Sequence, residues 1–125
     1  MQQKISVLIA EDERFISHAL KEIIRRNFAC DRLDIANDGA EAMGFLKSYS
    51  YDVAILDWNM PNKTGDEVLV DIRSASKTSS MPVIMLTARS DKDSVITAVQ
   101  AGTTDYIAKP FKQGDILQRI KRLLS

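Results

Sequence analysis

Short apolar runs alternate along the chain with longer segments in which apolar residues recur every three or four positions. A short apolar run rich in β-branched residues is typical of a strand, whereas the longer spacing is typical of a helix with one buried face. We therefore predict five strands, at residues 5–10, 34–36, 53–56, 82–87 and 105–108.

The segments that follow these strands predict five helices. The first helix carries a broad apolar stripe, which comprises Phe15, Ile16, Ala19, Leu20, Ile23, Ile24 and Phe28. The next three helices begin at polar pairs with the spacing of a helix cap, namely Asp38 with Glu41, Thr64 with Glu67, and Ser90 with Asp93. The last helix carries a stripe that comprises Ile116, Leu117, Ile120, Leu123 and Leu124.

The alternation of strands and helices determines the predicted fold class. Strands that alternate with helices form a parallel sheet whose helices cover both faces. We therefore predict an α/β fold, a doubly wound five-stranded parallel sheet with five helices distributed over both faces. Because 125 residues is close to the commonest size of a single domain, we expect one domain that spans residues 1–125.

Charge and cysteine content exclude several functional classes. The 17 Lys and Arg residues equal the 17 Asp and Glu residues in number, so no net positive field draws the domain to nucleic acid. Cys30 is the one cysteine, which excludes an internal disulfide and a cysteine-based zinc site. The N-terminal apolar run is too short for a signal peptide or a membrane span. We expect a soluble cytoplasmic domain that binds neither nucleic acid nor membrane.

Asp57 directly follows the continuous apolar run at residues 53–56. Such a run is typical of a strand buried on both faces, and in a parallel sheet the carboxyl ends of these strands border a crevice where ligands bind. Polar residues also follow or end the neighbouring predicted strands, namely Glu11, Asp12, Thr87 and Lys109. We therefore expect these side chains to meet Asp57 at one edge of the sheet.

Three carboxylates at one edge repel one another, and each raises the pKa of the others unless a cation offsets them. The candidates for that cation are Lys109 and a bound divalent metal ion. Oxygen ligands without a cysteine or histidine cluster favour Mg²⁺ over Zn²⁺. Asp57 could then act as a nucleophile on phosphorus, with Lys109 and the metal neutralising the transferred group. The Thr87 hydroxyl could donate a hydrogen bond to that group.

Four motifs at the predicted strand ends match one protein family. They are Glu11-Asp12, Asp57-Trp58-Asn59-Met60-Pro61, Thr87-Ala88 and Lys109-Pro110-Phe111, in this order. Across essentially its full length the chain resembles the receiver domain of two-component response regulators, of the chemotaxis type. The resemblance implies a flavodoxin-like sheet with the strand order 2-1-3-4-5. It also implies a phosphoprotein switch that catalyses only its own phosphorylation and dephosphorylation.

The resemblance implies a role for each matched residue. Asp57 is the expected phosphoacceptor and, with Asp12 and the backbone carbonyl of Asn59, an expected ligand of Mg²⁺. Glu11 stands where aspartate is more usual, and it is expected to bind the metal through water or a hydrogen bond. Lys109 is expected to pair with the phosphoryl group and to precede a cis peptide bond to the following proline.

Thr87 and Tyr106 are the switch pair that the resemblance implies. Thr87 would move toward a phosphoryl oxygen, Tyr106 would turn inward, and the surface of the fourth helix, fifth strand and fifth helix would change. The implied partners are a sensor histidine kinase or phosphotransfer protein that supplies the phosphoryl group, and an output domain or protein target that responds to the changed surface.

Other interpretations of the same residues stay open at this point. A small metal-dependent phosphohydrolase with an aspartyl nucleophile usually needs a second acid, and Asn59 occupies the obvious position without being one. A nucleotide or flavin binder needs a glycine-rich phosphate loop, where this chain has Glu11 and Asp12. A docking module without phosphorylation is disfavoured because the full set of motif residues is present. Taken singly, Asp12 could merely cap a helix and Tyr106 could be a half-buried strand aromatic.

Overall fold

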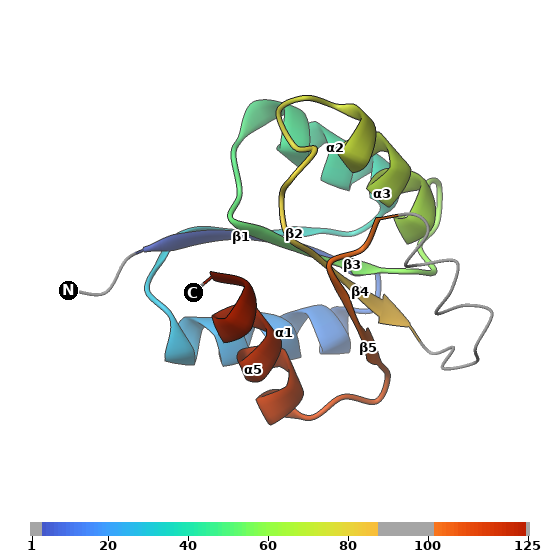
Figure 1. Cartoon of the computed structure of the whole chain (residues 1–125). Coiled ribbons are helices and arrows are strands. Elements are labelled where there is room, and N and C mark those ends of the chain that lie inside the picture. The colour runs from blue at the N-terminus through green and yellow to red at the C-terminus, as the bar shows by residue number, and fades with distance from the viewer. Residues whose placement is uncertain (1–3, 88–101, 125) are drawn as a thin grey trace.

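The computed structural model describes residues 4–87 and 102–124, and the five strands in these ranges form one parallel sheet (Figure 1). The strands are β1 (Ile5–Ala10), β2 (Cys30–Ala36), β3 (Val53–Asp57), β4 (Val83–Thr87) and β5 (Asp105–Ala108). Their order in the sheet is β2-β1-β3-β4-β5, and every neighbouring pair is parallel. The flavodoxin-like order that the resemblance implies is therefore confirmed.

Helices cover both faces of the sheet, as predicted. In the described ranges they are α1 (Arg14–Asn27), α2 (Gly39–Ser48), α3 (Gly65–Ser74) and α5 (Gln113–Leu124). Helices α1 and α5 lie on one face, and α2 and α3 lie on the other (Figure 1). The helix predicted to begin at Ser90 falls within residues 88–101, outside the described ranges. No helix in the described part of the chain is both long and apolar enough to cross a membrane.

Strand β3 lies at the centre of the sheet and is buried along its whole length. Side chains alternate between the two faces of a strand. Ala54 and Leu56 accordingly pack on the side of α2 and α3, whereas Val53 and Ile55 pack on the side of α1 and α5. Apolar clusters on both faces hold this strand, and they thereby fix the position of Asp57 at its carboxyl end.

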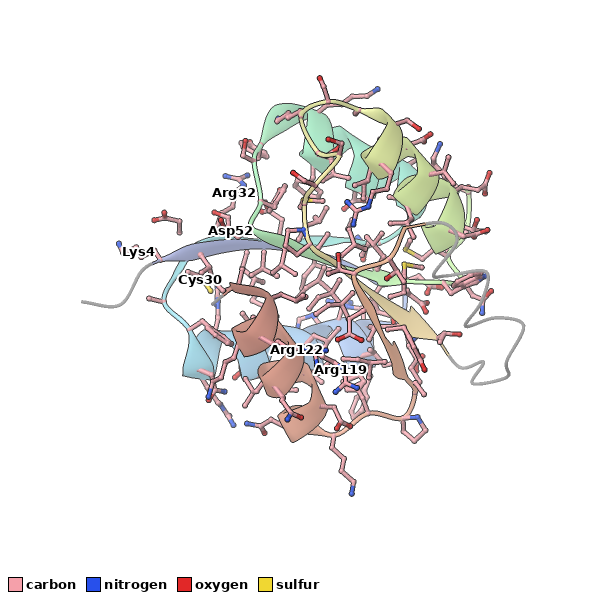
Figure 2. The ribbon with its side chains drawn as sticks, viewed as in Figure 1. Lys4, Cys30, Arg32, Asp52, Arg119 and Arg122 are labelled. Atoms are coloured by element: carbon pink, nitrogen blue, oxygen red, sulfur yellow. The ribbon has the colours of Figure 1, made fainter. Side chains whose placement is uncertain are left out.

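Helix α5 is joined to β5 by ion pairs as well as by apolar contacts. Ile116 and Ile120 are fully buried in the cluster beneath the sheet. The Nε atom of Arg119 lies 3.5 Å from Oδ2 of Asp105 in β5, and Arg122 pairs with the same carboxylate (Figure 2). Strand β5 is at the edge of the sheet, so β5 and α5 form one connected surface there.

Strand β2 is longer than predicted. The apolar pattern predicts only residues 34–36, but the strand begins at Cys30. Asp31 and Arg32 interrupt the apolar pattern. An edge strand tolerates such residues because one side of it faces solvent, and β2 is an edge strand whose residues are mostly half-buried. The prediction for the start of β2 is therefore wrong.

The predicted apolar stripe of the first helix is wrong at Phe15. Its side chain is 83% exposed, whereas Ser17, Leu20 and Ile24 form the buried face of α1. These three residues lie at intervals of three and four positions, the spacing of one helix face. Phe15 lies two positions before Ser17 and so points to a different side. The buried Ser17 hydroxyl is satisfied because it donates a hydrogen bond of 3.1 Å to the Arg14 carbonyl.

The predicted starts of α2 and α3 are confirmed. The Asp38 carboxylate accepts a hydrogen bond of 2.7 Å from the backbone N–H of Glu41. The Glu67 carboxylate accepts hydrogen bonds from the backbone N–H (3.1 Å) and the hydroxyl (2.8 Å) of Thr64. Such contacts satisfy donors that the first turn of a helix leaves unpaired. They also fix the two loops that precede α2 and α3.

Candidate functional site

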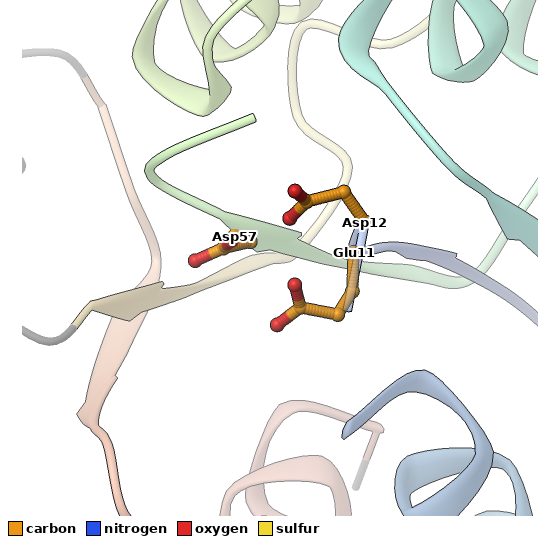
Figure 3. Close-up of side chains that lie close together, drawn as sticks. All are labelled: Glu11, Asp12 and Asp57. Carbon is orange, nitrogen blue, oxygen red and sulfur yellow. The ribbon is translucent and has the colours of Figure 1, made fainter. Parts of the chain in front are cut away.

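Three carboxylates meet at the carboxyl ends of β1 and β3 (Figure 3). The two strands pair in register as far as Ala10 and Leu56, so the residues that follow are neighbours. One oxygen atom from each of Glu11, Asp12 and Asp57 lies within 4.8 Å of the other two. We call these three residues the acidic cluster.

Lys109 reaches the acidic cluster from the end of β5. Its Nζ atom lies 2.5 Å from Oε1 of Glu11 and 3.0 Å from Oδ1 of Asp57. Its backbone N–H donates a hydrogen bond of 2.8 Å to the Thr87 carbonyl, which continues the pairing of β4 with β5. The peptide bond between Lys109 and Pro110 is cis, as the resemblance implies. The sheet itself therefore places the ammonium group beside two carboxylates.

Burial changes the pKa values of Glu11 and Lys109 at this site. Glu11 is 1% exposed and Asp57 is 5% exposed, while Asp12 is open to solvent. Burial raises the pKa of Glu11 to about 7, although the hydrogen bond from Lys109 acts in the opposite direction. Burial also lowers the pKa of Lys109, but hydrogen bonds with Glu11 and Asp57 outweigh this effect and raise that pKa above its ordinary value. Lys109 is therefore cationic at neutral pH.

The acidic cluster suits a divalent cation. One ammonium group beside three carboxylates leaves excess negative charge at the ends of β1 and β3. The donors are carboxylate oxygens, the ligands that Mg²⁺ prefers, and within residues 4–87 and 102–124 no cysteine or histidine joins the group. Because Asp12 is exposed, the cluster is accessible from solvent. These residues therefore fit Mg²⁺ better than Zn²⁺.

Thr87 and Tyr106 lie on the same face of neighbouring strands. In the register of β4 and β5, Met85 pairs with Tyr106, and Thr87 pairs with Ala108. Because side chains alternate along a strand, Thr87 shares its face with Met85 and Tyr106, and this is the face that α2 and α3 cover. Thr87 is buried at the end of β4, whereas Tyr106 is half-buried and lies farther back along β5. Tyr106 therefore lies two positions before the end of its strand, whereas Thr87 lies at the end of β4.

Asn59 is exposed in the segment that follows Asp57. This segment is held by Gly65, a residue that the sequence analysis missed. The Gly65 N–H donates a hydrogen bond of 2.9 Å to the Trp58 carbonyl, and a Cβ atom on Gly65 would lie 2.1 Å from the carbonyl oxygen of Asp57. Only glycine permits so close an approach. The available sequence signal is only a glycine at the predicted start of a helix, directly after Thr64.

Comparison with known proteins shows which family has this sequence pattern. The family model for the response regulator receiver domain matches residues 7–121. The chemotaxis protein CheY of Pseudomonas aeruginosa is 31% identical over 119 residues, which cover 95% of this chain and 95% of that protein. The family-model match begins within β1 and ends within α5, so it includes the whole acidic cluster together with Lys109.

Solved structures of similar chains have the same fold. The chemotaxis response regulator CheY4 of Vibrio cholerae has a TM-score of 0.90 and 26% identity, over 97% of this chain and 99% of that one. The receiver domain of the sensor histidine kinase PA1611 from Pseudomonas aeruginosa has a TM-score of 0.87 and 26% identity, over 98% and 100%. The latter structure has a magnesium ion coordinated in its active-site cleft. The present chain therefore belongs to the response regulator receiver domain family, the phosphorylation-linked switches of two-component signalling.

Proposed function

We propose that the protein is a phosphorylation-activated signalling switch whose phosphoacceptor is Asp57. The observation that carries this proposal is the position of the Asp57 carboxylate. It is buried at the end of the central strand β3, and its Oδ1 atom lies 3.0 Å from the ammonium nitrogen of Lys109. A fixed cation at this distance stabilises negative charge that develops on a group transferred to Asp57.

The phosphoryl donor is a phosphohistidine of a sensor histidine kinase or a phosphotransfer protein. A carboxylate oxygen of Asp57 attacks phosphorus, an oxygen–phosphorus bond forms, and the nitrogen–phosphorus bond of the donor breaks. The imidazole nitrogen leaves with the electron pair of that bond. Lys109 neutralises charge on the transferred group, and the Thr87 hydroxyl donates a hydrogen bond to one of its oxygens. Attack of water on phosphorus later restores the Asp57 carboxylate and releases inorganic phosphate.

A Mg²⁺ ion would be held by Asp12, Asp57 and the backbone carbonyl of Asn59, and by Glu11 through water or a hydrogen bond. When bound, it supplies positive charge that offsets the charge of the phosphoryl oxygens. The excess of carboxylates over ammonium groups in the acidic cluster supports this assignment. The coordinated magnesium ion in a similar receiver domain supports it as well.

Phosphorylation alters the surface that includes β5 and α5. Thr87 and Tyr106 share one face of adjacent strands, so a movement of Thr87 toward the phosphoryl group changes the space available to Tyr106. Tyr106 then turns inward, and the equilibrium between two packings of the surface shifts. An output domain or a protein target responds to the surface of the phosphorylated form.

Phosphorylation by a small-molecule donor tests this proposal. The protein is incubated with acetyl phosphate and Mg²⁺, and its intact mass is measured before and after hydroxylamine, which cleaves acyl phosphates. We expect a single phosphoryl group that requires Mg²⁺ and that hydroxylamine removes. It should be lost in Asp57→Asn and kept in the control Asp31→Asn, which changes an exposed aspartate of the edge strand β2. Repeated release of phosphate from phosphomonoesters would favour a metal-dependent phosphohydrolase instead.

A further inference from the structure

The loop between β3 and α3 contains a strained turn. Asn62 has a φ angle of 68°, a left-handed value that is uncommon outside glycine. The backbone N–H of Lys63 donates a hydrogen bond of 2.7 Å to the Pro61 carbonyl, which closes a three-residue turn centred on Asn62. Backbone of this kind persists only where surrounding contacts hold it. Groups outside the turn must therefore stabilise it.

Asp38 supplies one of these contacts. The Nδ2 atom of Asn62 donates a hydrogen bond of 2.7 Å to Oδ2 of Asp38, while Oδ1 of Asp38 accepts the hydrogen bond from Glu41 that caps α2. The hydrogen bond from Glu41 and the one from Asn62 hold the pKa of Asp38 below its ordinary value. One ionised side chain therefore joins the start of α2 to the loop after β3.

Gly39 supplies a second contact. A Cβ atom at this position would lie 2.0 Å from the carbonyl oxygen of Lys63, so only glycine lets the first turn of α2 press against the loop. On the other side, Nζ of Lys63 lies 2.5 Å from Oδ2 of Asp71 in α3. The turn is therefore held between the start of α2 and the body of α3.

These contacts bear on the acidic cluster because the loop is short and closed. The Gly65 N–H binds back to the Trp58 carbonyl, so residues 58–64 form a compact connection between β3 and α3. Asn59, whose carbonyl is a proposed metal ligand, lies in this connection three positions before Asn62. In so short a loop, a displacement of Asn62 also displaces the backbone of Asn59.

We propose that Asp38 and Asn62 form a positioning pair for the metal site. Their hydrogen bond holds the loop at residues 58–64 in the conformation that presents the Asn59 carbonyl to a divalent cation. Asp38 acts on the site through Asn62 and does not touch the ion. This inference rests on the proposed function, because the Mg²⁺ site is part of that proposal. It gives Asp38 a role beyond capping α2, and it gives Asn62 a role that its sequence context did not suggest.

Two substitutions remove the hydrogen bond of this pair while they keep the local backbone. Asp38→Ser retains a side chain that caps α2 but is too short to reach Asn62. Asn62→Gly retains a residue that accepts a positive φ angle but lacks the amide. The Mg²⁺ affinity of both single variants and of the double variant is measured by calorimetry and by the fluorescence of Trp58, the one tryptophan of the chain.

We expect each single substitution to weaken Mg²⁺ binding about 10-fold, as removal of groups that orient metal ligands commonly does. The double variant should bind no more weakly than either single variant, because both substitutions remove the same contact. Losses that simply add would show that the two residues act separately, and they would overturn the pair.

A stability control separates positioning from a general loss of structure. A Cβ atom at Gly44 in α2 would meet no heavy atom within 4 Å outside the helix, so Gly44→Ala stabilises α2 without touching the loop. Added to Asp38→Ser, it should raise the free energy of unfolding, measured with urea, and leave Mg²⁺ binding weak. Recovery of Mg²⁺ binding together with stability would overturn the inference.

The result for the wild-type protein distinguishes this inference from the proposed function. If the wild-type protein binds Mg²⁺ and the variants at Asp38 and Asn62 bind it equally well, the positioning pair is wrong and the metal site stands. If calorimetry shows no binding of Mg²⁺ to the wild-type protein, the metal site of the proposed function is wrong, and the positioning pair falls with it.

Discussion

At the scale of single residues, one ammonium group forms ion pairs with two buried carboxylates. Lys109 contacts both Glu11 and Asp57, and these two acids are almost fully buried. The contact with Glu11 holds the Lys109 side chain in place. The sequence pattern predicted that Lys109 could offset the charge of the three carboxylates, and the structure shows that Glu11 and Asp57 are the two that it contacts. Glu11, which is proposed to help bind the metal ion, therefore also orients the ammonium group of Lys109.

Replacing Lys109 with alanine tests the role of this cation. We expect Lys109→Ala to stay folded by circular dichroism, because Glu11 can take up a proton once its partner is gone. Phosphorylation by acetyl phosphate should slow by at least about 10-fold, since a fixed charge at the transferring group is lost. The NMR signals of Tyr106 should no longer shift on phosphorylation. The control Lys112→Ala changes an exposed lysine in the same segment and should behave as the wild type. A wild-type response in Lys109→Ala would contradict the proposed role.

The raised pKa of Glu11 predicts a pH-dependent stability. The ordinary pKa of this carboxyl group is 4.5, and burial raises it to about 7 in the folded state. Between these values the folded protein holds a proton that the unfolded chain has lost, so the free energy of unfolding falls as pH rises through this window. Relative to Glu11→Gln, we expect the free energy of unfolding of the wild type to fall by about 1–3 kcal/mol as the pH rises from 4.5 to about 7. Urea unfolding in the presence of a chelator measures this, and a constant difference across the window would contradict the shift.

At the scale of elements, glycines decide how closely the helices approach the site. Gly39 begins α2 and Gly65 begins α3, and neither position has room for a Cβ atom. The loop after β3 is therefore packed backbone to backbone between two helix starts. In contrast, Gly44 lies in the middle of α2 with open space around it. The first two glycines shape the site, whereas the third only lowers the stability of its helix.

Two glycine-to-alanine substitutions should accordingly have opposite effects on stability. Gly65→Ala places a Cβ atom 2.1 Å from the Asp57 carbonyl oxygen. We expect it to lower the free energy of unfolding by about 1–3 kcal/mol, as overpacking typically does. Gly44→Ala should raise it by about 0.5–1 kcal/mol. Urea unfolding measures both changes, and shifts of the same sign would show that the close contact at Gly65 does not exist in solution.

Arg73 connects the end of α3 to the segments that precede β4 and β5. Its Nη1 and Nε atoms donate hydrogen bonds of 2.7 Å to the carbonyls of Met81 and Gly102, and its Nη2 donates one of 3.2 Å to the Thr104 hydroxyl. Lysine lacks this planar set of donors. We expect Arg73→Lys to lower the free energy of unfolding by about 1–3 kcal/mol. The exposed control Arg26→Lys should change it by less than about 0.5 kcal/mol. Equal effects would rule out this connecting role.

At the scale of the whole molecule, the sheet and the acidic cluster follow from the sequence pattern. The apolar run before Asp57 predicts a buried strand, and parallel strands bring their carboxyl ends to one edge. Glu11, Asp12 and Lys109 therefore had to lie near Asp57 once the strands were identified. The pattern failed for β2, because an edge strand accepts polar residues such as Arg32 that hide its start.

The contacts that hold the loop after β3 could not be predicted. The hydrogen bond between Asp38 and Asn62 joins residues 24 positions apart, and neither residue departs from an ordinary local pattern. The approach of Gly39 to Lys63 depends on the absence of a side chain, which a hydrophobic pattern does not register. Such contacts are set by how the helices pack on the sheet, and they become visible only in three dimensions.

The central claim is that the fold places Asp57, beside Lys109 and the other carboxylates, to accept a phosphoryl group. The most direct measurement identifies the modified residue after reaction with phosphoramidate, a phosphorus–nitrogen donor, in the presence of Mg²⁺. Borohydride reduces an aspartyl phosphate to homoserine, and peptide mapping locates it. We predict homoserine at position 57, and none when a chelator replaces Mg²⁺. Homoserine at another position, or a phosphoryl group retained in Asp57→Asn, would contradict the account.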